Sequence, residues 1–75
     1  MKTGIYQHYK GPRYEVIDTV RHSETEELMV LYRTYYGDED LWVRPYTMFF
    51  EEVEFDGKVV PRFKYIDKKW VVVKN

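Results

Sequence analysis

Apolar and polar side chains alternate along much of the chain with a period of two, which is typical of β-strands and not of helices. The most apolar run, residues 28–33, is followed by a polar link that contains glycine, residues 37–40, and then by a second apolar run at 41–45. Two runs of β-forming residues around such a link indicate a hairpin. We therefore expect two paired strands here, and the rest of the fold to be built around them.

The second strand of this hairpin has two chemically different faces, because neighbouring side chains of a strand point to opposite sides. Leu41 and Val43 share one face, and Trp42 and Arg44 share the other. We expect Arg33, on the preceding strand, to lie on a side compatible with Trp42 and Arg44. Trp42 and Arg44 should both be at least partly exposed.

Two further strands are predicted near the N-terminus. Residues 4–10 alternate as a strand does and end at a Gly-Pro turn, residues 11–12. The next strand covers residues 14–21, but Asp18 falls in register with its apolar positions, where an unpaired carboxylate would be costly to bury. We expect a bulge or a sharp bend near residues 18–19 to resolve this conflict.

A third hairpin is predicted around the Asp-Gly pair at residues 56–57, because both residue types accept the positive φ angles of a type I′ turn. In this two-residue register Val53 opposes Val60, and Glu51 opposes Arg62. An apolar pair and a pair of opposite charges on one face both favour this alignment.

The remaining segments are connections and a tail. Residues 22–27 are polar throughout and are expected to form a solvated hairpin tip. Residues 46–50 follow a proline, and we expect a single 3₁₀ turn that presses Met48 and Phe49 onto the core. The last segment, residues 66–75, contains a Trp-Val-Val-Val run, which would be an association hazard as an unpaired edge. We expect it to form an extra C-terminal strand that pairs with its own sheet or with a second copy.

Composition narrows the class of protein. The chain has 75 residues, enough for one domain, and no cysteine, so its core must rest on its two Trp, eight Tyr and four Phe residues. Twelve basic and 13 acidic residues give a net charge of −1, which provides no overall attraction to nucleic acid or to an anionic membrane. No apolar run approaches the about 20 residues that cross a bilayer, and the N-terminus lacks a secretion signal. We therefore expect a cytoplasmic protein.

The sequence does not have the residue spacings expected of a metal site or a catalytic site. His8, His22 and Glu24 are ordinary metal-ligand types, but they lack the spacing of a three-ligand site, and we expect no metal. Ser23 adjoins His22, yet neighbours along a strand point apart and do not form a catalytic dyad. We expect that the protein is not an enzyme.

Aromatic rings and basic groups gather on one part of the predicted sheet and form the candidate ligand-binding set. Its members are Tyr6, His8, Arg33, Trp42 and Arg44. Such residue types are enriched at interaction hot spots. A structural role is the alternative: Trp42 would then cap the barrel, and Arg44 would stack on it or pair with Glu15 or Asp18.

Several motifs of the chain carry a family resemblance. They are Gly4 to Gly11, Tyr14 to Val16, Arg21 to Glu27, Tyr32-Arg33 with Tyr36 to Asp38, Leu41 to Pro45 with Met48-Phe49, and Val53 to Phe63. With these motifs, which cover about residues 3–64, the chain resembles a small bacterial family of uncharacterised domains. The resemblance implies an SH3-type β-barrel and no reaction, cofactor or partner. The chain departs from the family at Gln7, where members often carry a basic residue.

Together these observations predict an all-β protein, a small SH3-like five-stranded barrel over residues 1–65 with the tail at 66–75. We expect a non-enzymatic binding module without a cofactor, which recognises a peptide, a protein surface or a small anionic ligand through its aromatic and arginine side chains. The alternative is a single-stranded RNA-binding module, but the lack of a basic excess favours a protein or peptide partner. We expect no membrane partner, and either a monomer or a weak homodimer through the C-terminal strand.

Overall fold

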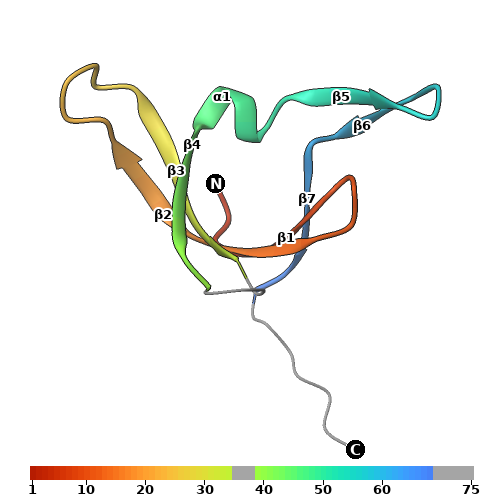
Figure 1. Cartoon of the computed structure of the whole chain (residues 1–75), viewed down its shortest axis with the longest axis horizontal. Coiled ribbons are helices and arrows are strands. Elements are labelled where there is room, and N and C mark those ends of the chain that lie inside the picture. The colour runs from red at the N-terminus through yellow and green to blue at the C-terminus, as the bar shows by residue number, and fades with distance from the viewer. Residues whose placement is uncertain (35–38, 69–75) are drawn as a thin grey trace, which may run out of the picture.

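The protein is all-β, as predicted (Figure 1). The computed structural model describes residues 1–34 and 39–68, and within them it contains seven strands and one helical turn. The elements are β1 (Gly4–His8), β2 (Arg13–Arg21), β3 (Leu28–Thr34), β4 (Leu41–Pro45), α1 (Tyr46–Phe49), β5 (Glu52–Phe55), β6 (Lys58–Pro61) and β7 (Phe63–Asp67). No described helix is long and apolar enough to cross a membrane.

Five strands form one antiparallel sheet in the order β4-β3-β2-β1-β7, and β5 pairs with β6 in a second sheet. In Figure 1 the larger sheet curls from β4 through β1 to β7, with α1 across the open side. Because β4 and β7 remain the two edges of this sheet among the described residues, an SH3-like closed barrel is not confirmed.

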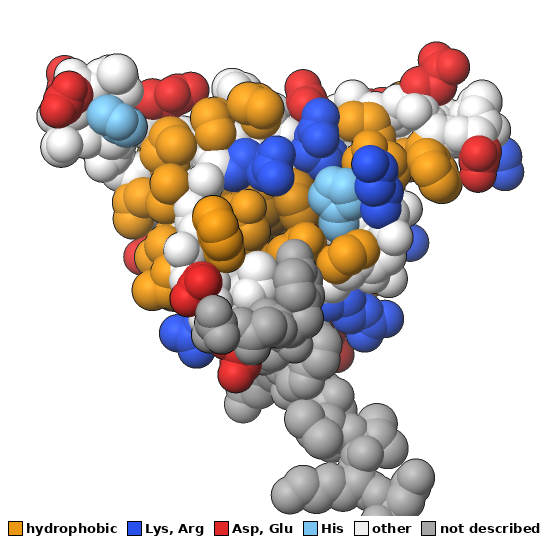
Figure 2. Space-filling view, in the orientation of Figure 1, with side chains coloured by type: hydrophobic (Ala, Val, Ile, Leu, Met, Phe, Trp, Pro, Cys, Tyr) orange, Lys and Arg blue, Asp and Glu red, His pale blue; other side chains and the backbone are white. Residues whose placement is uncertain are grey.

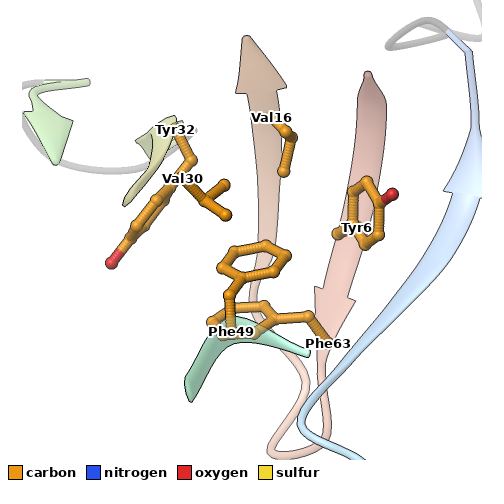
Figure 3. Close-up of a cluster of buried hydrophobic side chains, with 6 residues drawn as sticks. All are labelled: Tyr6, Val16, Val30, Tyr32, Phe49 and Phe63. Atoms are coloured by element: carbon orange, nitrogen blue, oxygen red, sulfur yellow. The ribbon is translucent and has the colours of Figure 1, made fainter. Parts of the chain in front are cut away.

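The core fills the concave side of the sheet, which we call the inner face (Figure 3). Its buried members are Tyr6, Val16, Val30, Tyr32, Phe49 and Phe63. The rings of Phe49 and Phe63 stack with their centroids 4.0 Å apart, so the helical turn and β7 meet at the base of the cluster. Aromatic side chains each bury a large area, which suits a core built from so few residues.

The predicted bulge is confirmed one residue earlier than expected. Val16 pairs with Tyr32 but Asp18 pairs with Leu31, so Ile17 is the extra residue of β2. An inserted residue switches the faces of all side chains that follow it. As a result Asp18 is exposed and its carboxylate accepts a hydrogen bond from the backbone of Thr19.

The single turn after β4 exists, but it is α-helical, and only one of its two expected contacts forms. Phe49 is fully buried, whereas Met48 is exposed. Neighbouring residues of a helix point about 100° apart, so a turn of four residues can direct only one large side chain at a given surface. Phe49 occupies that position, and the prediction for Met48 was wrong.

The Asp-Gly hairpin forms as predicted. Asp56 and Gly57 have φ angles of 53° and 74°, the two positive values of a type I′ turn. Val53 pairs with Val60. Beyond the strands the backbone and side chains of Glu51 and Arg62 also meet, with an ion pair between them.

The last described strand, β7, pairs with β1 and extends to Asp67, so residues 66–67 of the predicted tail belong to the sheet. The two strands approach closely at Gly4, where a Cβ atom would stand 2.4 Å from the Asp67 carbonyl oxygen and φ is +135°. Only glycine fits this position without displacing the backbone. The Trp-Val-Val-Val run at 70–73 lies outside the described residues.

Candidate functional site

Trp42 and Arg44 lie on the inner face, at the edge of the sheet. The register of β3 and β4 places Trp42 opposite Tyr32 and Arg44 opposite Val30, and opposed residues of an antiparallel pair share a face. Trp42 is 53 % exposed because β4 is an edge strand, and Arg44 is half-buried. The predictions that these two residues share a face and are at least partly exposed are both confirmed.

Arg33 lies on the opposite, outer face of the sheet. It lies opposite Leu41 of β4 and Glu15 of β2, whereas the preceding residue, Tyr32, lies opposite Trp42. The prediction that Arg33 shares a side with Trp42 and Arg44 was therefore wrong. The long link between β3 and β4 does not fix their register, and a shift of one residue reverses every face.

Tyr6 is a member of the core and is not available to a ligand. It is only 4 % exposed, and its hydroxyl donates a hydrogen bond of 2.7 Å to the carbonyl oxygen of Lys2. Burial raises the pKa of Tyr6, and the neighbouring Tyr65 and Tyr46 raise it further. Its role is structural.

His8 lies on the inner face beside the core. Its ring packs edge-on against Phe63, with centroids 5.0 Å apart, and lies 4.4 Å from the ring of Tyr9. The backbone N–H of Lys10 donates a hydrogen bond of 3.1 Å to His8 Nδ1. Because Nδ1 accepts this bond, the proton of the neutral ring resides on Nε2.

The surroundings of His8 are positively charged. Burial lowers the pKa of His8 below its ordinary value, and the charges of Arg62, Arg44 and Lys10 lower it further. Figure 2 shows Lys and Arg side chains gathered near the middle of the molecule, with most Asp and Glu side chains at the periphery. This part of the face therefore favours a negative group.

Arg44 contributes a charge that no carboxylate neutralises within the described residues. Its guanidinium carbon lies 5.6 Å from the centroid of the Phe63 ring. Its Nε atom is buried without a hydrogen-bond partner, the one such side-chain atom found in the described ranges. Arg62 differs, because Glu51 accepts hydrogen bonds from its Nε and Nη2 atoms.

The alternative roles suggested for Arg44 do not hold. It lies over Phe63 and not over Trp42. Glu15 lies opposite Arg33 in the β2–β3 register, on the outer face, and no ion pair joins Arg44 to Glu15 or Asp18 in the described structure.

A pocket of about 480 Å³ opens next to His8, between the β1–β2 turn and the β5–β6 hairpin. Its lining consists of Gln7, His8, Tyr9, Gly11, Phe55, Val60, Pro61 and Lys64. The rings of Tyr9 and Phe55 meet at 5.3 Å, and the Gln7 amide is held by a hydrogen bond to the Gly11 carbonyl. The walls are thus mainly apolar, with Lys64 as a charged group.

The sequence did not indicate this pocket, because two turns that are about 45 residues apart in the chain form it only after folding. The only local signal was the aromatic residue Phe55 directly before the Asp-Gly turn, which is exposed in the structure.

The second histidine has a local structural role. His22 Nδ1 accepts hydrogen bonds from the backbone N–H groups of Glu24 and Thr25 and so orders the β2–β3 hairpin tip. Among the described residues no group of three His, Cys, Asp or Glu side chains could hold a metal ion.

Comparisons with known proteins identify the family. No curated protein matches the chain. A crystal structure of a family member from Bordetella bronchiseptica is similar, with a TM-score of 0.84 and 29 % sequence identity over 99 % of this chain and 95 % of that one. The family model described as protein of unknown function (DUF1653) matches residues 4–65, in agreement with the resemblance seen in the sequence. The chain therefore belongs to the DUF1653 family.

Proposed function

We propose that the protein is a non-enzymatic binding module whose inner face recognises a peptide, a segment of another protein or a small anionic ligand. The observation that carries this proposal is the half-exposed Trp42 beside Arg44, whose charge is unpaired, on one face of an edge strand. Tryptophan and arginine are the residue types that most often dominate the energy of an interface.

The exposed indole has a substantial amount of apolar surface left to bury. Removing roughly 100 Å² of it from water would contribute about 2.5 kcal/mol at about 25 cal/mol per Å². Arg44 adds a polar contribution, since no carboxylate neutralises its guanidinium in the described structure and an anionic group of a ligand can pair with it. Together these groups can provide both affinity and orientation.

The neighbouring pocket supports the same proposal. Binding sites for small groups are concave and mainly apolar, with a few polar groups that fix orientation. The pocket beside His8 has this character, because the rings of Tyr9 and Phe55 form its walls and Lys64 lies at its lining. A ligand could therefore contact the inner face and place one side chain in the pocket.

The test is a titration of isotope-labelled protein, followed by amide chemical shifts, with short peptides of acidic, neutral and basic composition and with single-stranded oligouridylate. We expect a peptide to bind, and Trp42→Ala to weaken the binding about tenfold or more while the protein stays folded. Leu41→Ala is the matched control, because Leu41 is 55 % exposed on the same strand but on the outer face. Equal effects of the two substitutions would refute the proposal.

Oligouridylate is included because exposed aromatic and basic groups also suit single-stranded RNA. Binding of RNA that is tighter than that of every peptide, and that weakens steeply with salt, would replace the proposed partner by nucleic acid.

A further inference from the structure

Arg44 and His8 lie beside the same ring on the inner face. The guanidinium carbon of Arg44 is 5.6 Å from the Phe63 centroid, and the centroid of His8 is 5.0 Å from it. Phe63 itself is buried and stacks on Phe49, so it holds a fixed position in the core. Both side chains thus contact one rigid residue, and the charge of Arg44 acts on the ring of His8.

Both donors lack an acceptor in the described structure. Arg44 Nε is buried without a partner. His8 Nδ1 is occupied by the N–H of Lys10, which leaves the Nε2–H as the free donor of its ring. Buried polar groups in proteins are almost always paired, so Arg44 Nε calls for an explanation, whereas the Nε2–H of His8 belongs to a partly exposed side chain. A bound oxygen anion would neutralise the guanidinium of Arg44 and accept a hydrogen bond from the Nε2–H of His8.

The charge balance indicates an anion of low charge. Arg62 is already paired with Glu51, and Lys10 lies 5.7 Å over the Tyr9 ring at the edge of the site. Of Arg44 and Arg62, only Arg44 has a guanidinium that no carboxylate neutralises among the described residues. A single guanidinium with one further N–H donor fits the two oxygens of a carboxylate, since Arg and carboxylate groups match in a planar, bidentate arrangement.

The apolar pocket lies at the end of the sheet, where His8 belongs to its lining from the inner face and Gln7 and Lys64 line it from the outer face. Its walls include Tyr9, Phe55 and Val60, which suit a phenyl ring or a branched aliphatic group. We infer that the inner face binds a carboxylate between Arg44 and His8, and that an aromatic or branched apolar group of the same ligand occupies the adjoining pocket. The C-terminal residue of a peptide and a free aryl-substituted acid share this chemistry.

This inference rests on the proposed function and specifies its ligand. The probes that test it are N-acetyl-phenylalanine, its uncharged amide, the peptide acetyl-Ala-Ala-Phe with a free C-terminus, and inorganic phosphate. We expect both carboxylates to bind about tenfold or more tightly than the amide and than phosphate, as measured by amide chemical shifts. If acetyl-Ala-Ala-Phe binds more tightly than N-acetyl-phenylalanine, the ligand is a peptide; the reverse order indicates a small acid.

Two arginine variants form a matched pair. Arg44→Met removes the guanidinium and keeps the length of the side chain, and it should weaken carboxylate binding about tenfold. Arg33→Met makes the same change on the outer face of the neighbouring strand and should leave binding unchanged. Arg44→Gln is the second variant, should the methionine variant fail to fold. In addition, Phe55→Ala should reduce the difference in affinity between N-acetyl-phenylalanine and the same ligand with a methyl group in place of the phenyl group.

The ring of His8 supplies a readout that a purely structural Arg44 would not move. The charged groups that face His8 are Arg44, Arg62 with its partner Glu51, and Lys10, and Lys64 lies in the lining of the same pocket. A bound carboxylate offsets the positive charges, so saturation with N-acetyl-phenylalanine should raise the His8 pKa, followed by the chemical shifts of its ring protons.

The inference is overturned if the amide binds as well as the acid, if Arg44→Met and Arg33→Met bind equally, or if no probe binds at about 10 mM. If peptides instead bind in a manner that depends on Trp42 but not on Arg44 or on a carboxylate, this inference fails while the proposed binding face stands. The failure of the two proposals can thus be told apart.

Discussion

Arg44 should limit the stability of the protein. Its Nε–H is buried without an acceptor, although the rest of the residue is only half-buried. Such a group has lost its hydration and gained no hydrogen bond. If the group is kept for binding, its removal should make the unbound protein more stable.

The magnitude follows from three contributions to the free energy of unfolding. Removal of an unsatisfied buried N–H recovers about 1–3 kcal/mol. Loss of the contact between the guanidinium and Phe63 costs about 0.5–1 kcal/mol, because Arg44 is only partly desolvated. A methionine of similar length would regain about 0.3–1.5 kcal/mol through its sulfur and the same ring. The central values of these contributions add to about 2 kcal/mol, so Arg44→Met should stabilise the protein by about 2 kcal/mol.

The assay is equilibrium unfolding in urea at neutral pH, with Arg33→Met as the control. We expect a higher midpoint for Arg44→Met with an unchanged slope, and a change within about 0.5 kcal/mol for Arg33→Met. A destabilisation of Arg44→Met by more than about 1 kcal/mol would show that Arg44 holds the fold together, and the reasoning that reserves it for a ligand would fail.

Three further predictions test the fold and the electrostatics. Phe49→Ala should cost about 3–5 kcal/mol in urea unfolding, because Phe49 is fully buried, and the exposed Met48→Ala should cost less than about 1 kcal/mol; similar costs would contradict the described core. Gly4→Ala should lower the melting temperature strongly and broaden the amide signals of β1 and β7, since its Cβ would clash with the Asp67 carbonyl; a melting curve like that of the unmodified protein would show that the strands can separate there. Burial and basic neighbours lower the pKa of His8 in the folded state below its ordinary value of 6.5. The contribution of His8 to stability is therefore complete above pH 6.5, and it declines as the pH falls from 6.5 toward the lower pKa of the folded state. Urea midpoints between about pH 7 and pH 5 should show this decline, and His8→Phe should flatten it; a decline that persists in the variant would assign it to other groups.

The features that the sequence predicted correctly depend on local rules. Asp56 and Gly57 determine their turn through the φ angles that they accept, and the two-residue turn then fixes the partners of β5 and β6. The bulge in β2 could be anticipated because a buried carboxylate at Asp18 would have been unpaired. The common face of Trp42 and Arg44 follows from alternation along a single strand.

The features that the sequence did not predict depend on contacts between distant segments. The face of Arg33 relative to Trp42 is set by the register of β3 with β4, which alternation within each strand leaves open. Tyr6 and His8 alternate identically on β1, yet only Tyr6 is sealed in the core, because other rings surround it. The pocket beside His8 requires two turns to approach each other, and no local pattern encodes that approach.

The central claim is that ligands bind on the inner face of the sheet. Its most direct test is a map of chemical-shift changes on isotope-labelled protein saturated with the peptide acetyl-Ala-Ala-Phe. The account predicts that changes concentrate at Trp42, Arg44, His8 and the pocket residues, and that the indole N–H of Trp42 shifts. Changes that concentrate instead at Leu41, Val43 and Arg33 would place the binding surface on the outer face and contradict the account.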